Sequence, residues 1–136
     1  MKGIQTHFVK LDNPVVRLSE SKPKEAAFLS NINKRILDNL GDERFDANAL
    51  SVIMAMSRAQ LLRRLKALTG YSPGFYIKSM RLEKAKEFLE TSDVSVSEAA
   101  FNTGFGTPSN FSKVFTEKYG ITPSQFRLIN LNATNK

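Results

Sequence analysis

Apolar residues recur at helical spacing through most of this chain. In residues 24–40 they fall at every fourth position, which places them on one stripe of an α-helix and predicts a helix that ends near Gly41. In residues 57–70, leucines at positions i, i+4 and i+7 form a similar stripe, while arginine and lysine lie on the opposite side. The pattern therefore predicts an all-α fold built from amphipathic helices.

Helix-start and helix-stop signals divide this pattern into separate helices. In a capping box, a Ser or Thr is followed three residues later by Glu or Gln, and the two side chains satisfy backbone N–H groups at a helix start. Such boxes occur at Ser57 and Gln60, at Ser95 and Glu98, and at Thr122 and Gln125. Asp46, Ser72 and Thr107 are further predicted caps, the last two directly before a proline suited to the first helical position. Gly70 and Gly120 are suited to ending helices.

The predicted helices form two similar units. Each unit is a short helix, a turn and a helix with a polar face, which is the helix-turn-helix arrangement. The first unit covers about residues 46–70 and the second about 95–120, with a long helix at about 73–90 between them. Residues 1–22 have no sustained period and contain two X-Pro pairs, so we predict a leader or linker there, and a frayed polar tail at 132–136.

Apolar positions within these helices are predicted to form the core. The chain has ten Phe and no Trp, and the phenylalanines sit at core spacing, so we interpret them as packing residues and not as a platform for stacked bases. The positions expected to face inward are Leu50, Ile53 and Met54 in the first short helix, Phe75, Met80, Leu82, Ala85, Phe88 and Leu89 in the long helix, and Phe111, Val114 and Phe115 in the second polar-faced helix, with a terminal helix through Phe126, Leu128 and Ile129.

Charge points to a polyanionic partner. The formal net charge is +7 and the isoelectric point is about 9.8, which favours DNA, RNA or an anionic membrane surface without choosing among them. The segment from Ser57 to Gly70 carries Arg58, Arg63, Arg64 and Lys66 and no acidic residue. Taken alone, this segment is more typical of a solvated basic helix than of a binding surface.

Several classes of protein are disfavoured by composition. Without cysteine there is neither a disulfide framework nor a thiolate metal site, and His7, the one histidine, is predicted to be a surface residue. No apolar run reaches membrane-spanning length, and the start lacks the apolar core of a signal peptide. Acidic residues are scattered, with no convergent pair for acid-base chemistry. We therefore expect a cytoplasmic protein that is not an enzyme and has no metal or cofactor.

A set of short motifs runs through the chain in a single register. They are Arg81-Leu82 with Ala85, Ala99-Ala100-Phe101, Gly104-Phe105, Phe111, Phe115, Gly120 and Thr122-Pro123, preceded by the segment MSRAQLLRRLKALTGYSP. Together they resemble the AraC/XylS family of bacterial transcription activators. The resemblance covers about residues 24–130. It implies a seven-helix DNA-binding domain, at 23–131 here, with two helix-turn-helix subdomains joined by a linker helix. Their recognition helices would enter successive major grooves about 34 Å apart.

The resemblance also assigns residues in the first recognition helix. Arg58, Ala59, Leu62 and Arg63 match positions that face bases, while Arg64 and Lys66 are better placed for phosphates. Arg63 is the strongest candidate, because an arginine can bond both O6 and N7 of a guanine. A phosphate contact is nearly as consistent with Arg63, since at least half of protein–DNA hydrogen bonds go to the backbone.

In the second recognition helix, Ser109, Asn110 and Lys113 are the predicted base-reading residues. Thr107 with the helix N-terminus is a predicted phosphate site. Local capping is a strong alternative for this helix, because Ser and Asn near a helix start often bond to nearby backbone. It also carries less positive charge than the first recognition helix, so we expect it to contribute less affinity.

The sequence therefore predicts a sequence-specific, double-stranded DNA-binding transcription regulator. The resemblance implies an activator that contacts RNA polymerase and is commonly joined to a sensory or dimerisation module. Residues 1–22 would then be a linker into such a module, including the receiver type of hybrid two-component regulators. The alternatives are a basic helical adaptor that binds protein or RNA, and a nonspecific DNA-binding protein. Discrimination between DNA sequences, typically about 10³-fold or more, separates the first reading from the others.

Overall fold

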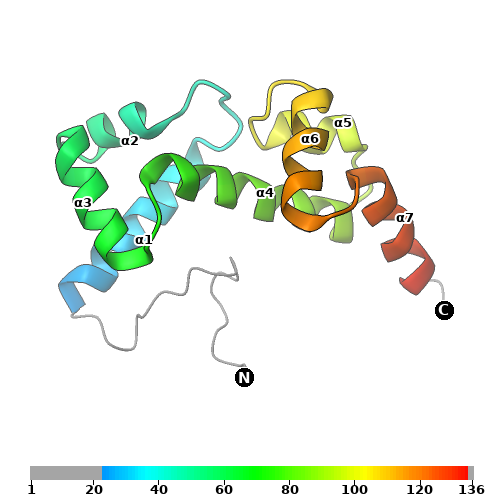
Figure 1. Cartoon of the computed structure of the whole chain (residues 1–136), viewed down its shortest axis with the longest axis horizontal. Coiled ribbons are helices and arrows are strands. Elements are labelled where there is room, and N and C mark those ends of the chain that lie inside the picture. Colours follow the sequence, from blue (N-terminus) through cyan, green and yellow to red (C-terminus); the bar gives the residue numbers. More distant parts are fainter. Residues whose placement is uncertain (1–22, 135–136) are drawn as a thin grey trace. The chain divides into compact units, whose positions relative to one another are not determined.

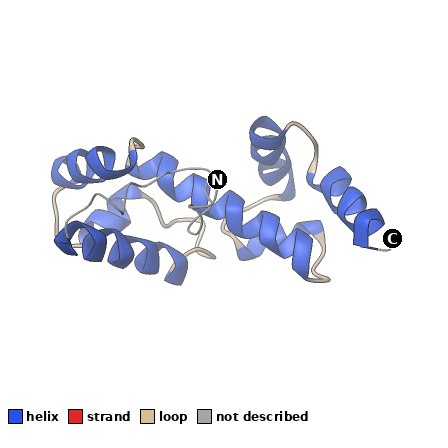
Figure 2. Ribbon diagram, turned by 90° about the horizontal axis from the view of Figure 1, so that it is seen from below, coloured by secondary structure: helices blue, strands red, loops and turns tan. Residues whose placement is uncertain are grey.

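The computed structural model describes residues 23–134, and every regular element in that range is an α-helix (Figures 1 and 2). The all-α, seven-helix expectation is confirmed. The leader predicted at 1–22 and His7 lie outside the described residues. The helices are α1 (Pro23–Asp38), α2 (Ala47–Ile53), α3 (Arg58–Thr69), α4 (Pro73–Thr91), α5 (Val96–Asn102), α6 (Pro108–Tyr119) and α7 (Pro123–Thr134).

The predicted capping boxes set the starts of three helices. In α3, the Gln60 N–H donates to Ser57 Oγ at 3.0 Å, and the Ser57 N–H donates to Gln60 Oε1 at 2.9 Å. The boxes before α5 and α7 make the same reciprocal pair of bonds. Gly70 and Gly120 end α3 and α6 in the left-handed region, each with a φ of +84°, where a side chain would be strained. Local sequence therefore fixes both ends of α3.

The chain divides into two compact units, each with one helix-turn-helix. Unit 1 holds the described residues up to Asn39 together with Phe45–Met80, so it contains α1, α2, α3 and the start of α4. Unit 2 holds the short segment Leu40–Arg44 together with the chain from Arg81 onward, so it contains the rest of α4 with α5, α6 and α7. The segment Leu40–Arg44 thus precedes the first helix-turn-helix in sequence but packs with the second.

Unit 1 is built on the predicted stripe of α1. Phe28, Ile32 and Ile36 are buried there, together with residues from α2 and α3. Tyr76, from the first turns of α4, is only 1% exposed, and its hydroxyl donates to Asn33 Oδ1 at 2.7 Å. Burial raises the pKa of the Tyr76 hydroxyl far above its usual range, and the bond to Asn33 offsets this rise only in part. Tyr76 therefore ties α4 to α1 as a neutral group.

Unit 2 has a Phe-rich core, as predicted. Phe105, Phe111 and Phe115 form a run of ring contacts, with centroids 5.1 and 5.5 Å apart, and Phe126 of α7 continues it at 5.7 Å. Such distances suit tilted and edge-to-face aromatic pairs. The buried residues around the rings are Leu82, Ala85, Leu89, Ala99 and Ala100. Phe105, Phe111 and Phe115 are thus packing residues that support the buried face of α6, whereas Phe101 of α5 is 57% exposed, against the prediction.

Some predicted inward positions are wrong. In α4, Phe75 is 42% exposed, while its neighbours Tyr76 and Ile77 are buried instead, because the stripe that continues through residues 81, 82, 85 and 89 begins at these two positions. Ile53 is also exposed, since it is the last residue of the short α2. The helix predicted through Leu128 and Ile129 exists, but both side chains are exposed, and α7 runs on to Thr134 through residues predicted as tail.

Candidate nucleic-acid interface

The basic face predicted for α3 is present and exposed. Leu61 and Leu65 are fully buried on one side of the helix, which turns the other side to solvent. Six residues of α3 are candidates for contacts with bases or phosphates. All of them except Arg64 lie on the exposed side, namely Arg58, Ala59, Leu62, Arg63 and Lys66. Because α3 contains no acidic residue, nothing within the helix neutralises this face. A charged helix face of this kind, at the second position of a helix-turn-helix, suits the major groove of DNA.

Arg64 differs from its neighbours. It is half-buried, and the central carbon of its guanidinium lies 3.9 Å from the centroid of the Phe28 ring in α1. An arginine stacked on an aromatic face is held by a cation–π interaction. Its long side chain is therefore oriented by unit 1 itself, and the predicted phosphate contact of Arg64 remains a prediction.

The second candidate helix, α6, begins with local capping bonds. Thr107 Oγ1 accepts from the Asn110 N–H at 3.1 Å, and Asn110 Nδ2 donates to the carbonyl oxygen of Phe105 at 3.3 Å. The capping role considered as the alternative is therefore present for both side chains. Ser109 and Lys113 are exposed on the outer side of α6. Lys113 and Lys118 are the basic residues of α6, and Glu117 offsets one of them, so this face is less positive than that of α3.

Equivalent positions of α3 and α6 are fifty residues apart in the sequence. The caps Ser57 and Thr107 and the terminating glycines Gly70 and Gly120 occupy matching places. Within the helices the same spacing pairs Ala59 with Ser109 and Arg63 with Lys113, and all four side chains are exposed. The candidate reading residues of the two units are therefore equivalent by position in the fold, although only α3 has a concentrated positive charge.

Two arginines that sequence analysis did not place are bound to backbone carbonyl groups in unit 2. Arg81 is buried, and Arg127 of α7 donates from Nε to Leu89 O at 3.1 Å and from Nη2 to Val94 O at 2.7 Å. Their guanidinium groups therefore stabilise the fold of unit 2 by binding its backbone carbonyl groups. A sequence signal existed for Arg81, since spacings of four from Ile77 and to Ala85 put it on the buried stripe of α4.

Across residues 23–134, no three His, Cys, Asp or Glu side chains gather where they could hold a metal ion. Over the same range, none of the helices has the length and apolar character needed to cross a membrane.

Comparisons with known proteins agree with this geometry. The model of a helix-turn-helix domain family matches residues 50–128, which is more than half of the chain. Histidine kinase P4 of Formosa agariphila is 37% identical over 94 residues, which are 69% of this chain and 7% of that protein. The HTH-type transcriptional regulator MtrA of Neisseria gonorrhoeae is 33% identical over 99 residues, which are 73% of this chain and 33% of that protein. The chain thus spans a third or less of the length of these relatives.

A solved structure of a DNA-binding domain is also similar to this chain. The DNA-binding domain of AdpA, a global transcriptional factor, was solved in complex with a target DNA. It is 33% identical to this chain with a TM-score of 0.69, and the match covers 74% of this chain and 90% of that domain.

Proposed function

This chain belongs to the AraC/XylS family of helix-turn-helix proteins, and from that membership we propose that it is the DNA-binding part of a transcription regulator that reads a specific sequence in double-stranded DNA. The observation that carries the proposal is the exposed, acid-free basic face of α3, whose two ends are fixed by the Ser57 capping box and by Gly70. A rigid helix with this charge suits the major groove, where donor and acceptor patterns distinguish all base pairs.

In this proposal α3 supplies most of the affinity and α6 adds a second, weaker reading element. Arg63 bonds a guanine edge, with Arg58, Ala59 and Leu62 beside it. Lys66 contacts a phosphate. Ser109 and Lys113 read the second motif from equivalent positions of α6, and the two motifs lie in successive major grooves about one turn apart. The lower charge of α6 supports this order of importance, because phosphate contacts provide much of the affinity for DNA.

We also propose that the chain works as the output domain of a longer regulator. The relatives it matches are much longer than the chain, and one of them is a histidine kinase, which favours a sensory or receiver module of two-component type. As in the family, the regulator would activate transcription in the bacterial cytoplasm through contact with RNA polymerase.

The test is selection of bound duplexes from a random DNA pool. The selected duplex is then titrated against scrambled duplex and against RNA of the same length at one fixed salt concentration, because affinities for nucleic acids depend strongly on salt. We expect two short motifs about one helical turn apart and a preference of about 10³-fold or more over scrambled DNA.

Each other outcome selects a different reading. Recovery of one motif would mean that a single helix reads bases. Equal affinity for all duplexes, with a steep salt dependence, would indicate nonspecific DNA binding. Preference for the RNA, or no binding to either nucleic acid, would favour a basic adaptor.

A further inference from the structure

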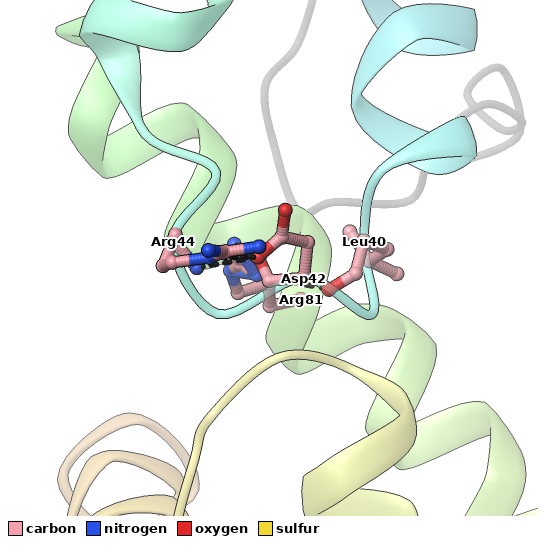
Figure 3. A network of polar contacts seen from close by, with 4 residues as sticks. All are labelled: Leu40, Asp42, Arg44 and Arg81. Carbon is pink, nitrogen blue, oxygen red and sulfur yellow. Dashed lines mark hydrogen bonds and ion pairs between the residues drawn. The ribbon is translucent and has the colours of Figure 1, made fainter.

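A buried arginine of unit 2 takes no part in the proposed DNA contacts. Arg81, in α4, is 6% exposed. Its Nη1 donates to the carbonyl oxygen of Leu40 at 3.0 Å, and its Nη2 donates to that of Asp42 at 3.1 Å (Figure 3). Nη1 also donates to the carbonyl oxygen of Thr103 at 3.2 Å. Burial lowers the pKa of Arg81 and the Asp42 carboxylate raises it, but an arginine stays charged in either case. One cation therefore joins carbonyl groups from two segments that are far apart in sequence.

One of these segments is the turn that leads into α6. Thr103 caps α5, and Gly104 follows it with a φ of +82°. A Cβ atom at Gly104 would overlap Arg81 Nη1 and the carbonyl oxygen of Leu40, so the backbone of the turn lies directly on the guanidinium. The turn is bound to α6 in its own right, because Asn110 Nδ2 donates to Phe105 O at 3.3 Å. A displacement of the turn would therefore be passed on to α6.

The other segment is Leu40–Arg44, which belongs to unit 2. Its shape is set by Asp42, whose Oδ1 accepts from the Arg44 N–H at 2.9 Å and from Arg44 Nε at 3.3 Å. These bonds hold the pKa of the Asp42 carboxyl below its usual value. The carboxylate is thus engaged with Arg44, while Arg81 binds the backbone of the segment (Figure 3). The segment lies outside residues 50–128, the range matched by the family model.

The corresponding turn of unit 1 is held in a different way. It lies between α2 and α3, and Ala55 occupies the left-handed position that Gly104 has in unit 2. Its contact with α1 is a weak one, from Asn31 Nδ2 to Met54 Sδ at 3.7 Å. The amides of both turns are hydrogen-bonded in the same pattern, at Ala55 and Met56 in unit 1 and at Gly104 and Phe105 in unit 2. The two turns can therefore be compared within one molecule.

We propose that Arg81 is a positioning residue for DNA reading by the second helix-turn-helix: it fixes the α5–α6 turn against the segment Leu40–Arg44 and so sets the orientation of α6. It follows that this segment is a functional part of the second reading unit, although it precedes the first in sequence. The inference rests on the proposed function, in that α6 must contact DNA for its orientation to matter.

The experiment uses the whole chain and the selected duplex, with versions in which one motif or the other is scrambled. The ratio of affinities for intact and scrambled duplex measures discrimination at each motif. In Arg81→Met we expect discrimination at the α6 motif to fall by about tenfold or more, a loss comparable to that of a mismatched base pair. Discrimination at the α3 motif should stay within about twofold of its original value. In Arg81→Lys, which keeps the charge but not the fork of donors, we expect an intermediate loss.

Two variants control for a general weakening of unit 2. Arg127→Lys removes another guanidinium that binds backbone carbonyl groups in unit 2, but one that touches the end of α4 and not the α5–α6 turn. Thr91→Val removes a side-chain hydrogen bond to the carbonyl oxygen of Glu87 within α4, away from the α5–α6 turn and from the segment Leu40–Arg44. Both should keep discrimination at the two motifs, even where circular dichroism shows a lower melting temperature. Equal losses at both motifs in Arg81→Met, or the same α6-specific loss in Arg127→Lys, would overturn the proposal.

A measurement without DNA separates this proposal from the proposed function. Amide hydrogen exchange in Arg81→Met should show lost protection at Gly104 and Phe105, with protection kept at Ala55 and Met56. Unchanged protection at Gly104 and Phe105 would refute the positioning role whether or not the chain reads DNA. Loss of protection throughout unit 2, even in Arg81→Lys, would refute it in favour of a general structural role. If exchange behaves as expected but the unmodified chain prefers no duplex, it is the proposed function that fails, together with the part of this inference that rests on it.

Discussion

Arg63 and Lys66 lie one helical turn apart on the exposed face of α3, yet they are expected to act differently on DNA. Arg63→Ala should cost about 1–3 kcal/mol of binding free energy on the selected site and relax the preference at one base pair, because a bidentate bond to guanine is lost. Titration of the variant against duplexes substituted at each base pair measures this change. A loss of the same size on scrambled DNA would make Arg63 a phosphate contact.

Lys66 provides the matched comparison. Lys66→Ala should weaken binding to all sequences by a similar factor and reduce the slope of log affinity against log salt by about one, since one fewer phosphate is neutralised. The measurement is a salt titration with selected and scrambled duplex. An unchanged slope with an altered base preference would exchange the roles assigned to the two side chains.

Ala55 is the single non-glycine residue with a positive φ, +57°, in the described chain. The left-handed conformation costs a residue with a Cβ about 1–2 kcal/mol, while glycine loses about 0.5–1 kcal/mol more chain entropy on folding. Ala55→Gly should therefore stabilise the protein by about 0.5–1 kcal/mol, as measured by urea unfolding. The reverse change in the other turn, Gly104→Ala, should be strongly destabilising, because its Cβ would overlap Arg81 and Leu40 O. A loss of stability in Ala55→Gly would contradict the strain argument.

At the scale of elements, the bond from Tyr76 in α4 to Asn33 in α1 should make stability depend on alkaline pH. Burial raises the pKa of the Tyr76 hydroxyl in the folded state, whereas a tyrosine in the unfolded chain ionises near pH 10. Above about pH 10 the unfolded chain therefore binds fewer protons than the folded one, and the free energy of unfolding falls as pH rises. Below that pH the contribution of Tyr76 is fully present.

Tyr76→Phe removes this group. We expect a cost of about 1 kcal/mol at pH 7, because Asn33 loses its donor, and a smaller decline in stability than the unmodified chain shows between about pH 10 and 11.5. Urea unfolding of both proteins across this range measures the difference. A constant difference between Tyr76→Phe and the unmodified chain at all pH values would rule out Tyr76 as the source.

The same elements show what sequence alone could predict. Caps and stops are local chemistry, so the boxes at Ser57 and Ser95 and the glycine ends of α3 and α6 were predicted correctly. The face of α4 was harder, because Phe75 and Tyr76 are adjacent and only tertiary contacts decide which one is buried. Arg81 was recognised as part of a motif but not as a buried residue. Its spacing of four from Ile77 and to Ala85 placed it on the buried stripe of α4, but its partners are backbone carbonyl groups, which the sequence does not identify.

The exposure of the candidate base-facing residues could be predicted further for α3 than for α6. An acid-free basic face is visible in sequence and is exposed in the fold. The polar residues at the start of α6 were compatible with capping and with reading. The fold shows Thr107 and Asn110 in capping bonds, so Ser109 and Lys113 remain the clearest candidates there.

At the scale of the whole molecule, the chain passes between its two units three times. It leaves unit 1 after Asn39, returns at Phe45, and leaves again after Met80 within α4. The boundary between the two units falls within α4, which is one continuous helix of 19 residues. A protein of this kind should be sensitive to the spacing of the two DNA motifs.

We therefore expect insertions between the two motifs to be costly at every length. Five added base pairs turn the second motif by about half a helical turn, to the opposite face of the duplex, and affinity should fall to that of a duplex with one motif. Ten added base pairs restore the face but add about 34 Å to the separation of the two motifs, and we expect affinity not to recover. Titration of duplexes with zero, five and ten added base pairs, alongside equal insertions outside the motifs, measures this dependence. If affinity recovered at ten added base pairs, the link between the two units would have to be flexible. If affinity did not depend on the spacing at all, the two units would bind DNA independently.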